Sequence, residues 1–367
     1  MDQPATGSVD NETTDQSYAD AEARSARLEE ELRTDPGAHR MLTGDRPTGP
    51  LHLGHYFGTL HNRVRLQDTG IQMFVLVADY QTITDRDSPK SLPQDVDALL
   101  ADYLAVGIDP ERTTIFAHTQ ITALNQLFLP FLSLVSVAEL NRNPTVKDEV
   151  NAAGQTAMSG LMFTYPVHQA ADILFCKGTV VPVGKDQLPH LEVARVVARR
   201  FNRRYSRERR YFPEPAALLS EAPVLLGTDG QKMSKSRGNA IALSATADET
   251  SRLLSRAKTD SERRITYDPA NRPDVSNLVL LGALCLDRTP ESVAEEVGAG
   301  GSAALKSLVA EAVNERFRDI RKRRAELIAD RGHLRRILAA GNERAREVAD
   351  ATLADVKRLM HTDYPIG

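Results

Sequence analysis

The chain has 367 residues, of which 41% are hydrophobic and 26% charged, and its formal net charge is −4. This length exceeds the usual size of a single hydrophobic core, so we expect two domains. Two cysteines, Cys176 and Cys285, are too few for a disulfide framework or a cysteine-built metal site. No apolar run approaches the roughly 18 residues of a membrane span, and none resembles a signal peptide, so we expect a cytoplasmic protein without a membrane partner.

Residues 1–38 form an acidic segment with ten acidic residues, three arginines and almost no large aliphatic residue before Leu28. Such a segment buries too little apolar surface to fold by itself. We therefore predict a disordered extension, with at most a short helix near residues 21–32. The rest of the chain is mildly basic, with 43 lysines and arginines against 40 acidic residues.

From residue 40 onward, short apolar runs alternate with helical patterns. We predict strands at residues 40–44, 71–78, 113–117 and 180–183, and helices at residues 53–68, 93–106, 124–137 and 159–175. This alternation predicts an α/β fold, a Rossmann-like doubly wound parallel sheet that binds ligands at the carboxyl ends of its strands. Only helical patterns follow, at residues 248–257, 276–286, 302–329 and 335–359. We therefore expect a catalytic domain at residues 39–240 and a helical domain at residues 241–367.

The first motif, TGDRPTGPLHLGH at residues 43–55, is typical of a phosphate-binding turn that leads into a helix. Gly44 and Gly49 allow backbone N–H groups to approach an anion. His52 and His55 are three residues apart, so both imidazoles lie on one helix face near its positive end. An isolated HxxH is more often a surface pair or half of a metal site. Because no cysteine or carboxylate lies nearby at a ligand-like spacing, we predict no metal-ligating residues.

A second motif, KMSKS, comprises Lys232, Met233, Ser234, Lys235 and Ser236. Two lysines and two hydroxyls suit a loop that closes over a pyrophosphate leaving group, although such a loop alone is usually a solvated linker. The order and spacing of the two motifs resemble the class I aminoacyl-tRNA synthetases.

The segment TYPVHQAADIL at residues 164–174 predicts a helix with proline in its first turn, and Tyr165, Gln169 and Asp172 fall on one face. Polar groups on one stripe of an apolar helix indicate a pocket wall. A buried carboxylate that accepts an indole N–H or a phenol O–H rejects analogues without that donor by roughly 10⁴–10⁵-fold. At this point tryptophan and tyrosine fit equally well, and the alternative is an Asp172 that only caps or pairs internally.

Residues 180–190, VVPVGKDQLPH, predict a strand that ends at Gly184, with Asp186 and Gln187 at a helix start. The carboxylate suits a ribose and the amide oxygen suits a ligand amine, although Asp186 alone would be an ordinary N-cap. With TYPVHQAADIL, TDSE at residues 259–262 and ITYD at residues 265–268, this pattern resembles the bacterial tryptophanyl-tRNA synthetases over about residues 39–361. Tyrosyl enzymes share the framework but usually differ at these stretches.

The resemblance implies that L-tryptophan is activated by ATP and Mg²⁺ and transferred to tRNA(Trp) by a homodimer, with residues 124–137 as a candidate interface. It implies catalytic roles for His52, His55, Lys232 and Lys235. Tyr165 and Gln187 would bind the α-amino group, Asp172 would accept the indole N–H, and Gln169 and Gln81 would complete the substrate pocket. The implied ATP site comprises Arg46, Pro47, Thr48, Gly54, His55, Gly184, Lys185, Asp186, Val224, Lys232, Met233, Ser234, Lys235 and Ser236.

Some positions depart from the commonest bacterial pattern. Tyr80-Gln81 stands where many relatives have Gln-His, Gln169 where Met is frequent, and Lys185 where Glu is usual. These departures resemble the auxiliary, second type of bacterial enzyme, and they predict resistance to tryptophan-mimicking antibiotics such as indolmycin. Basic clusters at residues 195–210 and 316–324 are candidate tRNA contacts, with a solvated helix face as the alternative. We expect the C-terminal helices to read the anticodon region.

Overall fold

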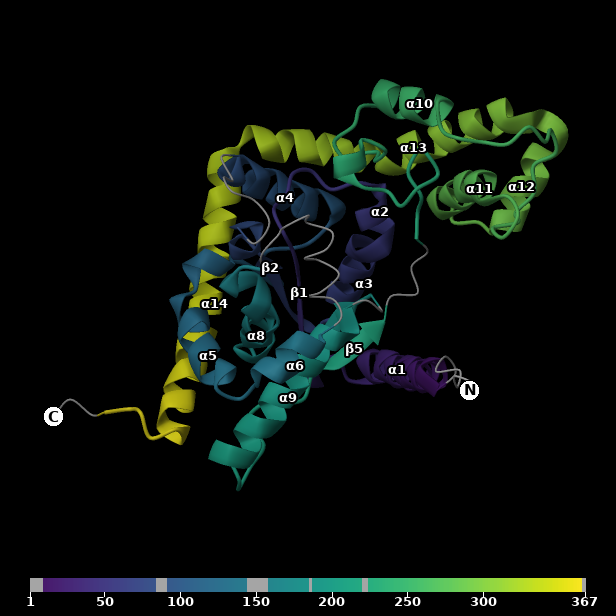
Figure 1. Cartoon of the computed structure of the whole chain (residues 1–367). Coiled ribbons are helices and arrows are strands. Elements are labelled where there is room, and N and C mark those ends of the chain that lie inside the picture. The colour runs from purple at the N-terminus through teal and green to yellow at the C-terminus, as the bar shows by residue number, and fades with distance from the viewer. Residues whose placement is uncertain (1–8, 84–90, 144–157, 185–186, 220–223, 365–367) are drawn as a thin grey trace, which may run out of the picture.

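A five-stranded parallel sheet in the order β3-β2-β1-β4-β5 lies at the centre of the protein (Figure 1). The computed structural model describes residues 9–83, 91–143, 158–184, 187–219 and 224–364. The strands are β1 (Arg40–Asp45), β2 (Gln72–Val77), β3 (Thr113–Ala117), β4 (Val180–Val183) and β5 (Ala216–Leu219). The predicted α/β class and all four predicted strands are confirmed. The fifth strand is not among the predictions, because its four residues, AALL, are equally compatible with a helix.

Both faces of the sheet are buried, and successive side chains of each strand enter different cores. Met41 of β1 lies in register with Met73 of β2, and both join one core, whereas the next pair, Leu42 and Phe74, joins the other. This two-sided burial explains why the strands are continuous apolar runs instead of alternating patterns.

Helices cover the two faces of the sheet. One core contains residues of α2 (Leu53–His55), α3 (His61–Thr69) and α4 (Leu92–Val106), with a π-helical turn at Tyr56–Leu60 between α2 and α3. The other contains residues of α5 (Thr122–Leu132), α6 (Val137–Arg142), α8 (Gly160–Leu174) and α9 (Leu188–Tyr205). The predicted helix at residues 124–137 is wrong at its C-terminal end, because α5 stops at Leu132 and a capping box at Ser136 starts α6.

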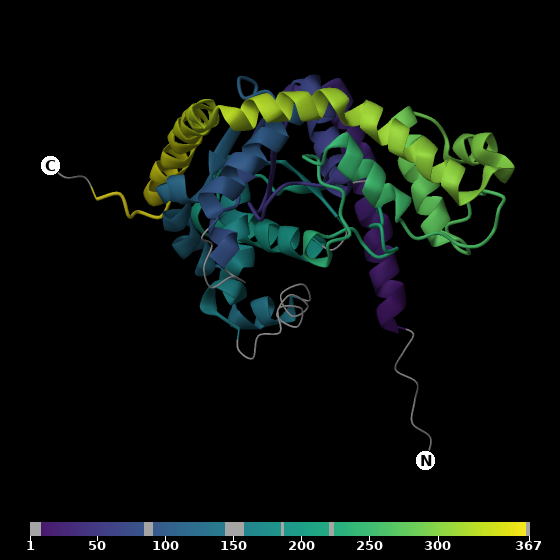
Figure 2. The ribbon, with the colours of Figure 1, turned by 90° about the horizontal axis from the view of Figure 1, so that it is seen from above.

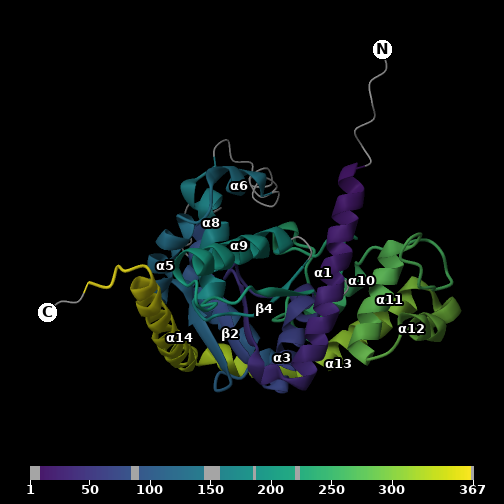
Figure 3. The ribbon, with the colours of Figure 1, turned by 90° about the horizontal axis from the view of Figure 1, so that it is seen from below.

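The N-terminal segment forms helix α1 (Val9–Thr34), which lies beside β5 (Figures 1 and 3). The predicted disorder is therefore wrong for this stretch, and the short helix expected near residues 21–32 lies within α1. Leu28 and Leu32 are buried in a core, and the Leu219 N–H at the sheet edge donates to Ser25 Oγ at 2.8 Å. Packing against the edge strand β5 buries apolar side chains that this segment could not bury by itself.

The C-terminal region is helical, as predicted. Its helices are α10 (Ala247–Ser255), α11 (Pro273–Leu286), α12 (Pro290–Val297), α13 (Gly301–Ala329) and α14 (Arg331–Leu359), of which only α12 is not predicted. Figure 2 shows α13 running from α11 and α12 back across the molecule to α14. Within the described ranges, no helix is long and apolar enough to cross a membrane.

Helix α14 packs directly on the edge strand β3. The Ala117 N–H donates to Asn342 Oδ1 at 2.9 Å, and Thr352 Oγ1 donates to the Phe175 carbonyl oxygen at 2.7 Å. At Gly341 the helix backbone is so close to Ile115 of β3 that a Cβ would lie 1.8 Å from its carbonyl oxygen. The last helix is thus integral to the core of the sheet, although the predicted division places it in the helical domain.

Candidate active site

The first motif follows the carboxyl end of β1 and places its two histidines in contact. The ring centroids of His52 and His55 are 3.7 Å apart, as expected for two imidazoles on one face. The His52 backbone N–H donates to His55 Nδ1 at 3.2 Å. Because Nδ1 accepts this hydrogen, a neutral His55 carries its proton on Nε2 and can donate that proton to a ligand.

Both histidines are neutral near pH 7. Burial lowers the pKa of His52 to about 3, and His55 and Lys235 act in the same direction. Burial also lowers the pKa of His55 to about 4, against the opposing effect of Asp45. In the free protein the two imidazoles therefore offer hydrogen bonds to an anion, whereas the positive charge beside them comes from Lys235.

The second motif lies against the first. Lys235 Nζ donates to the Gly49 carbonyl oxygen at 2.8 Å and lies 3.4 Å from Thr48 Oγ1. The chain that follows the KMSKS residues pairs with the first motif, because the Leu53 N–H donates to the Ile241 carbonyl oxygen at 3.0 Å. Two segments separated by about 175 residues in the sequence thus form one site, as their pairing predicts.

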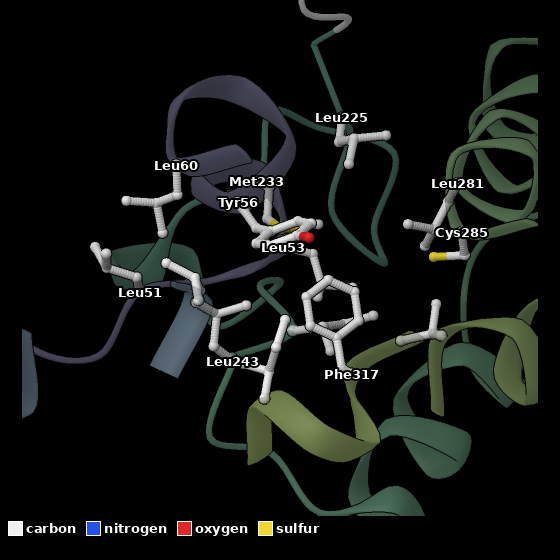
Figure 4. Close-up of a cluster of buried hydrophobic side chains, with 14 of the residues drawn as sticks. Leu51, Leu53, Tyr56, Leu60, Leu225, Met233, Leu243, Leu281, Cys285 and Phe317 are labelled. Atoms are coloured by element: carbon white, nitrogen blue, oxygen red, sulfur yellow. The ribbon is translucent and has the colours of Figure 1, made fainter. Parts of the chain in front are cut away.

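A hydrophobic cluster beneath this site joins the motifs to the C-terminal helices (Figure 4). Met233 is buried in it, and the rings of Tyr56 and Phe317 meet edge to face with centroids 4.7 Å apart. A Cβ at Gly54 would lie 3.0 Å from the His52 ring and 3.6 Å from Met233 Sδ. This glycine therefore allows the two motifs to approach closely.

A cavity of about 450 Å³ opens beside the carboxyl ends of β1 and β4. Seven of the predicted site residues line it, and they are Arg46, Gln81, Tyr165, Gln169, Asp172, Gly184 and Gln187. The polar stripe predicted on α8 is therefore one wall of this cavity. A volume of this size is typical of small-molecule sites.

One end of the cavity carries a buried ion pair that is not among the predicted residues. Arg63 of α3 binds the carboxylate of Asp45, and Tyr103 OH donates to Asp45 Oδ2 at 2.6 Å. Burial opposes ionisation of Asp45, but Arg63 and Tyr103 outweigh it and lower the pKa of this carboxyl group. The signal in the sequence is an arginine three residues after Leu60, on the buried face of the helix.

Tyr165 and Gln187 are linked through a third residue. The Tyr165 hydroxyl is 2.8 Å from His190 Nε2, and His190 Nδ1 is 3.1 Å from Gln187 Oε1. His190 is 1% exposed, so it fixes the two polar groups from behind. The two residues expected to bind an amino group therefore lie on one side of the cavity.

Some predicted site residues are not placed in this cavity. Lys185 and Asp186 lie outside the described residues, as does the side chain of Ser236. Val224 is 69% exposed and does not line the cavity. Lys232 is exposed in the loop of the second motif.

The two basic clusters differ in their surroundings. In the second cluster, Arg324 pairs with the buried Asp102 and Arg323 donates to the Ala105 carbonyl oxygen, so both arginines attach α13 to α4. In the first cluster, Arg203, Arg204 and Arg207 are exposed and line a surface hollow beside Ser133 and Ser136. Arg318 and Arg323 of the second cluster are also exposed, but they do not line this hollow.

An open parallel sheet with a glycine-rich turn, paired histidines and a lysine loop at its strand ends defines a Rossmann-like nucleotide-binding enzyme. The model of the family "tRNA synthetases class I (W and Y)" matches residues 35–318. The chain belongs to this family.

Similar proteins narrow the comparison. The chain is 40% identical to the tryptophan-tRNA ligase of Clostridium longisporum over 333 residues, 88% of this chain and 97% of that protein. It is 41% identical to the same ligase of Treponema pallidum over 330 residues, 88% of this chain and 96% of the relative. The crystal structure of Campylobacter jejuni tryptophanyl-tRNA synthetase, complexed with ADP and tryptophan, superposes with a TM-score of 0.77 at 33% identity. That match covers 88% of this chain and 99% of the other.

Proposed function

We infer that this protein is a tryptophan-tRNA ligase, which activates L-tryptophan with ATP and transfers it to the 3′ end of tRNA(Trp). The observation that carries this inference is the cavity lined by Tyr165, Gln169 and Asp172, whose wall also includes Gly44 and Arg46 of the first motif. Its relatives at about 40% identity are tryptophan-tRNA ligases over nearly their whole length. The Campylobacter enzyme was crystallised with ADP and tryptophan, which supports an adenine nucleotide and tryptophan as the ligands of this site.

The substrate would lie with its indole ring at Asp172 and its α-amino group at Tyr165 and Gln187. Its carboxylate oxygen attacks the α-phosphorus of ATP, the bond from phosphorus to the bridging oxygen breaks, and pyrophosphate leaves with the electron pair. A hydroxyl of the terminal tRNA ribose then attacks the carbonyl carbon, and AMP leaves. No side-chain nucleophile takes part, so catalysis consists of positioning and charge neutralisation.

The ATP phosphates would lie between the two motifs. Lys235 neutralises the leaving pyrophosphate, and Lys232 approaches from the same loop. His52 and His55 donate hydrogen bonds, and Arg46, Pro47, Thr48 and Gly54 shape the turn. Gly184, Lys185, Asp186 and Val224 would hold the ribose and adenine, with Met233, Ser234 and Ser236 closing the loop.

Mg²⁺ would enter this site already bound to the phosphates of ATP. The motifs supply imidazole, ammonium and hydroxyl groups, whereas Mg²⁺ prefers phosphate and carboxylate oxygens and retains several waters. When bound, the ion supplies further neutralisation of phosphate charge. The side chains of the two motifs orient the phosphates instead of ligating the ion.

We propose that the enzyme belongs to the auxiliary, indolmycin-resistant type. Gln81 and Gln169 both line the cavity, so the two departures from the common bacterial pattern lie where an indole-containing inhibitor would bind. These two amides add hydrogen-bonding groups beside Tyr165 and Asp172, which changes recognition of any ligand with a different polar pattern.

We further propose that the enzyme is a cytoplasmic homodimer that binds tRNA(Trp) through Arg203, Arg204 and Arg207. The anticodon would be read by the helical region at residues 241–367. Leu129 of α5 and Val137 of α6 are 70% and 64% exposed, and a second copy of the chain would cover them. Sedimentation of the protein would reveal the mass of a dimer, and Leu129→Glu should shift it to that of a monomer.

Tryptophan binding tests the proposed function. The chain contains no tryptophan, so the fluorescence of the ligand is observed without a protein indole background. Asp172→Asn should weaken binding by about 10–100-fold, the effect of losing a hydrogen bond to a charged group. Asp68→Asn is the control, because Asp68 is 61% exposed on α3 and pairs with Arg112. Unchanged affinity in the Asp172 variant would place the indole elsewhere.

A further inference from the structure

His118 lies directly behind two residues of the cavity wall. It begins the 3₁₀ turn His118–Gln120 after β3 and is fully buried without lining the cavity. Its Nδ1 is 3.3 Å from Gln81 Oε1, and its Nε2 is 2.7 Å from Asp172 Oδ1. One imidazole thus contacts, from outside the cavity, two side chains that face into it.

A proton must lie between His118 and Asp172. Both atoms, His118 Nε2 and Asp172 Oδ1, are buried, and among the described residues neither has a hydrogen-bond partner in good geometry, although the two atoms lie 2.7 Å apart. A nitrogen lone pair facing a carboxylate oxygen at 2.7 Å would be repulsive, so Nε2 carries the proton. Nδ1 is then an acceptor, which the Gln81 amide satisfies when its N–H₂ group faces the ring in place of Oε1. With Oδ1 engaged in this way, the second carboxylate oxygen remains available to a ligand.

The plane of the His118 ring is fixed by its neighbours. His168 stacks on it with centroids 4.2 Å apart and an interplanar angle of 10°. Tyr80 meets the His118 ring nearly edge on, and Phe128 does the same to His168. The imidazole cannot turn away from Asp172 without disrupting this stack.

His118, His168 and Asp172 lie close enough together to be considered as a metal site. The ligand atoms of His118, His168 and Asp172 lie within 4.8 Å of one another. However, a metal requires nitrogen lone pairs that converge on one point, whereas parallel stacked rings direct theirs along separate planes. The stacked arrangement favours a hydrogen-bonded network over an ion.

We propose that His118 is a positioning residue that sets the specificity of the amino-acid pocket, by holding Asp172 in the orientation that accepts the indole N–H. This proposal rests on the proposed function. If His118 fixes the carboxylate, its loss frees Asp172 to rotate and weakens the penalty on analogues without an N–H group. Binding of the apolar part of the ring would be unaffected, because His118 does not line the cavity.

Two substitutions of His118 test this proposal, and they differ in which ring nitrogen of His118 the new side chain can replace. His118→Gln can place an amide N–H near the position of Nε2 and restore the contact with Asp172. His118→Asn reaches only the position of Nδ1 and retains the contact with Gln81. Both remove the stacked ring, so they form a matched pair in which only the reach toward Asp172 differs.

The assay is amino-acid-dependent exchange of pyrophosphate into ATP, with tryptophan and with β-(3-benzothienyl)alanine, in which sulfur replaces the indole N–H. We expect His118→Asn to lower kcat/KM for tryptophan by about 10–100-fold, with much less change for the sulfur analogue and for the KM of ATP. His118→Gln should restore most of the discrimination between the two amino acids.

An equal loss with both amino acids in both variants would overturn the proposal, because it would show a purely structural role. Micromolar inhibition by Zn²⁺ that His118→Asn abolishes would also overturn it, in favour of a metal site. If the asparagine variant fails to fold, His118→Ser takes its place as the variant that cannot reach Asp172, and equal discrimination in His118→Ser and His118→Gln would overturn the proposal. Failure of the wild-type protein to exchange with tryptophan would instead refute the proposed function.

Discussion

The packing of α14 on β3 can be tested by adding one methyl group. A Cβ at Gly341 would lie 1.8 Å from the Ile115 carbonyl oxygen and 2.8 Å from its carbon. These are backbone atoms of a strand within the sheet, so they cannot rotate away, and α14 must withdraw by more than an ångström. That movement stretches the hydrogen bond from the Ala117 N–H to Asn342 Oδ1.

Gly341→Ala should lower the free energy of unfolding by about 2–4 kcal/mol. Forced overpacking contributes about 1–3 kcal/mol, and the weakened buried hydrogen bond contributes about 1 kcal/mol. Scanning calorimetry should show a fall of several degrees in Tm.

Gly332→Ala is the matched control in the same helix. Gly332 is exposed, and its Cβ would approach only the ends of the Asp330 and Arg336 side chains, at 3.3 and 3.4 Å. The better helix propensity of alanine should leave stability unchanged or raise it by about 0.5–1 kcal/mol. Equal Tm values for the two alanine variants would refute the close packing of α14 on the strand.

Three further results follow from the site. Because the pKa of His52 is about 3 in the folded protein and 6.5 in its ordinary state, the unfolded chain binds the extra proton. Stability should therefore fall as the pH drops from 6.5 toward 3, by about 2 kcal/mol at pH 5 from this group, and His52→Gln should flatten the slope in urea titrations. Lys235→Ala should lower kcat of pyrophosphate exchange by about 10²–10³-fold, whereas Lys258→Ala, an exposed lysine, should not. Gln81→His should increase inhibition by indolmycin, and unchanged inhibition would eliminate this residue as a cause of resistance.

The central sheet was predictable because its signals are local. Two buried parallel strands, Thr113–Ala117 and Val180–Val183, were bounded correctly from continuous apolar runs between turn residues. Helix α1 was predicted only as a short helix near residues 21–32 of a disordered extension, because the surface that orders it belongs to β5, about 190 residues away in the sequence. A polar segment can fold when a distant partner supplies buried contacts, and composition alone does not reveal that partner.

The candidate site divides in the same way. Tyr165, Gln169 and Asp172 were predicted as one wall because a single helix period places them on one face. His118 and the Asp45–Arg63 pair were not predicted, because their partners come from different elements. The spacing of Arg63 from Leu60 marks a buried position but does not identify its partner. Residues that belong to a sequence motif can be recognised from the sequence. Residues that orient them can be recognised only from the folded structure, where elements distant in sequence come together.

The most direct test of the proposed function is amino-acid-dependent exchange of labelled pyrophosphate into ATP, with tryptophan, tyrosine and phenylalanine compared at one Mg²⁺ concentration. We predict exchange with tryptophan alone, because the proposed pocket pairs the indole N–H with the Asp172 carboxylate. Preferential exchange with tyrosine would contradict the assigned substrate, and no exchange with any of the three would contradict the adenylation chemistry itself.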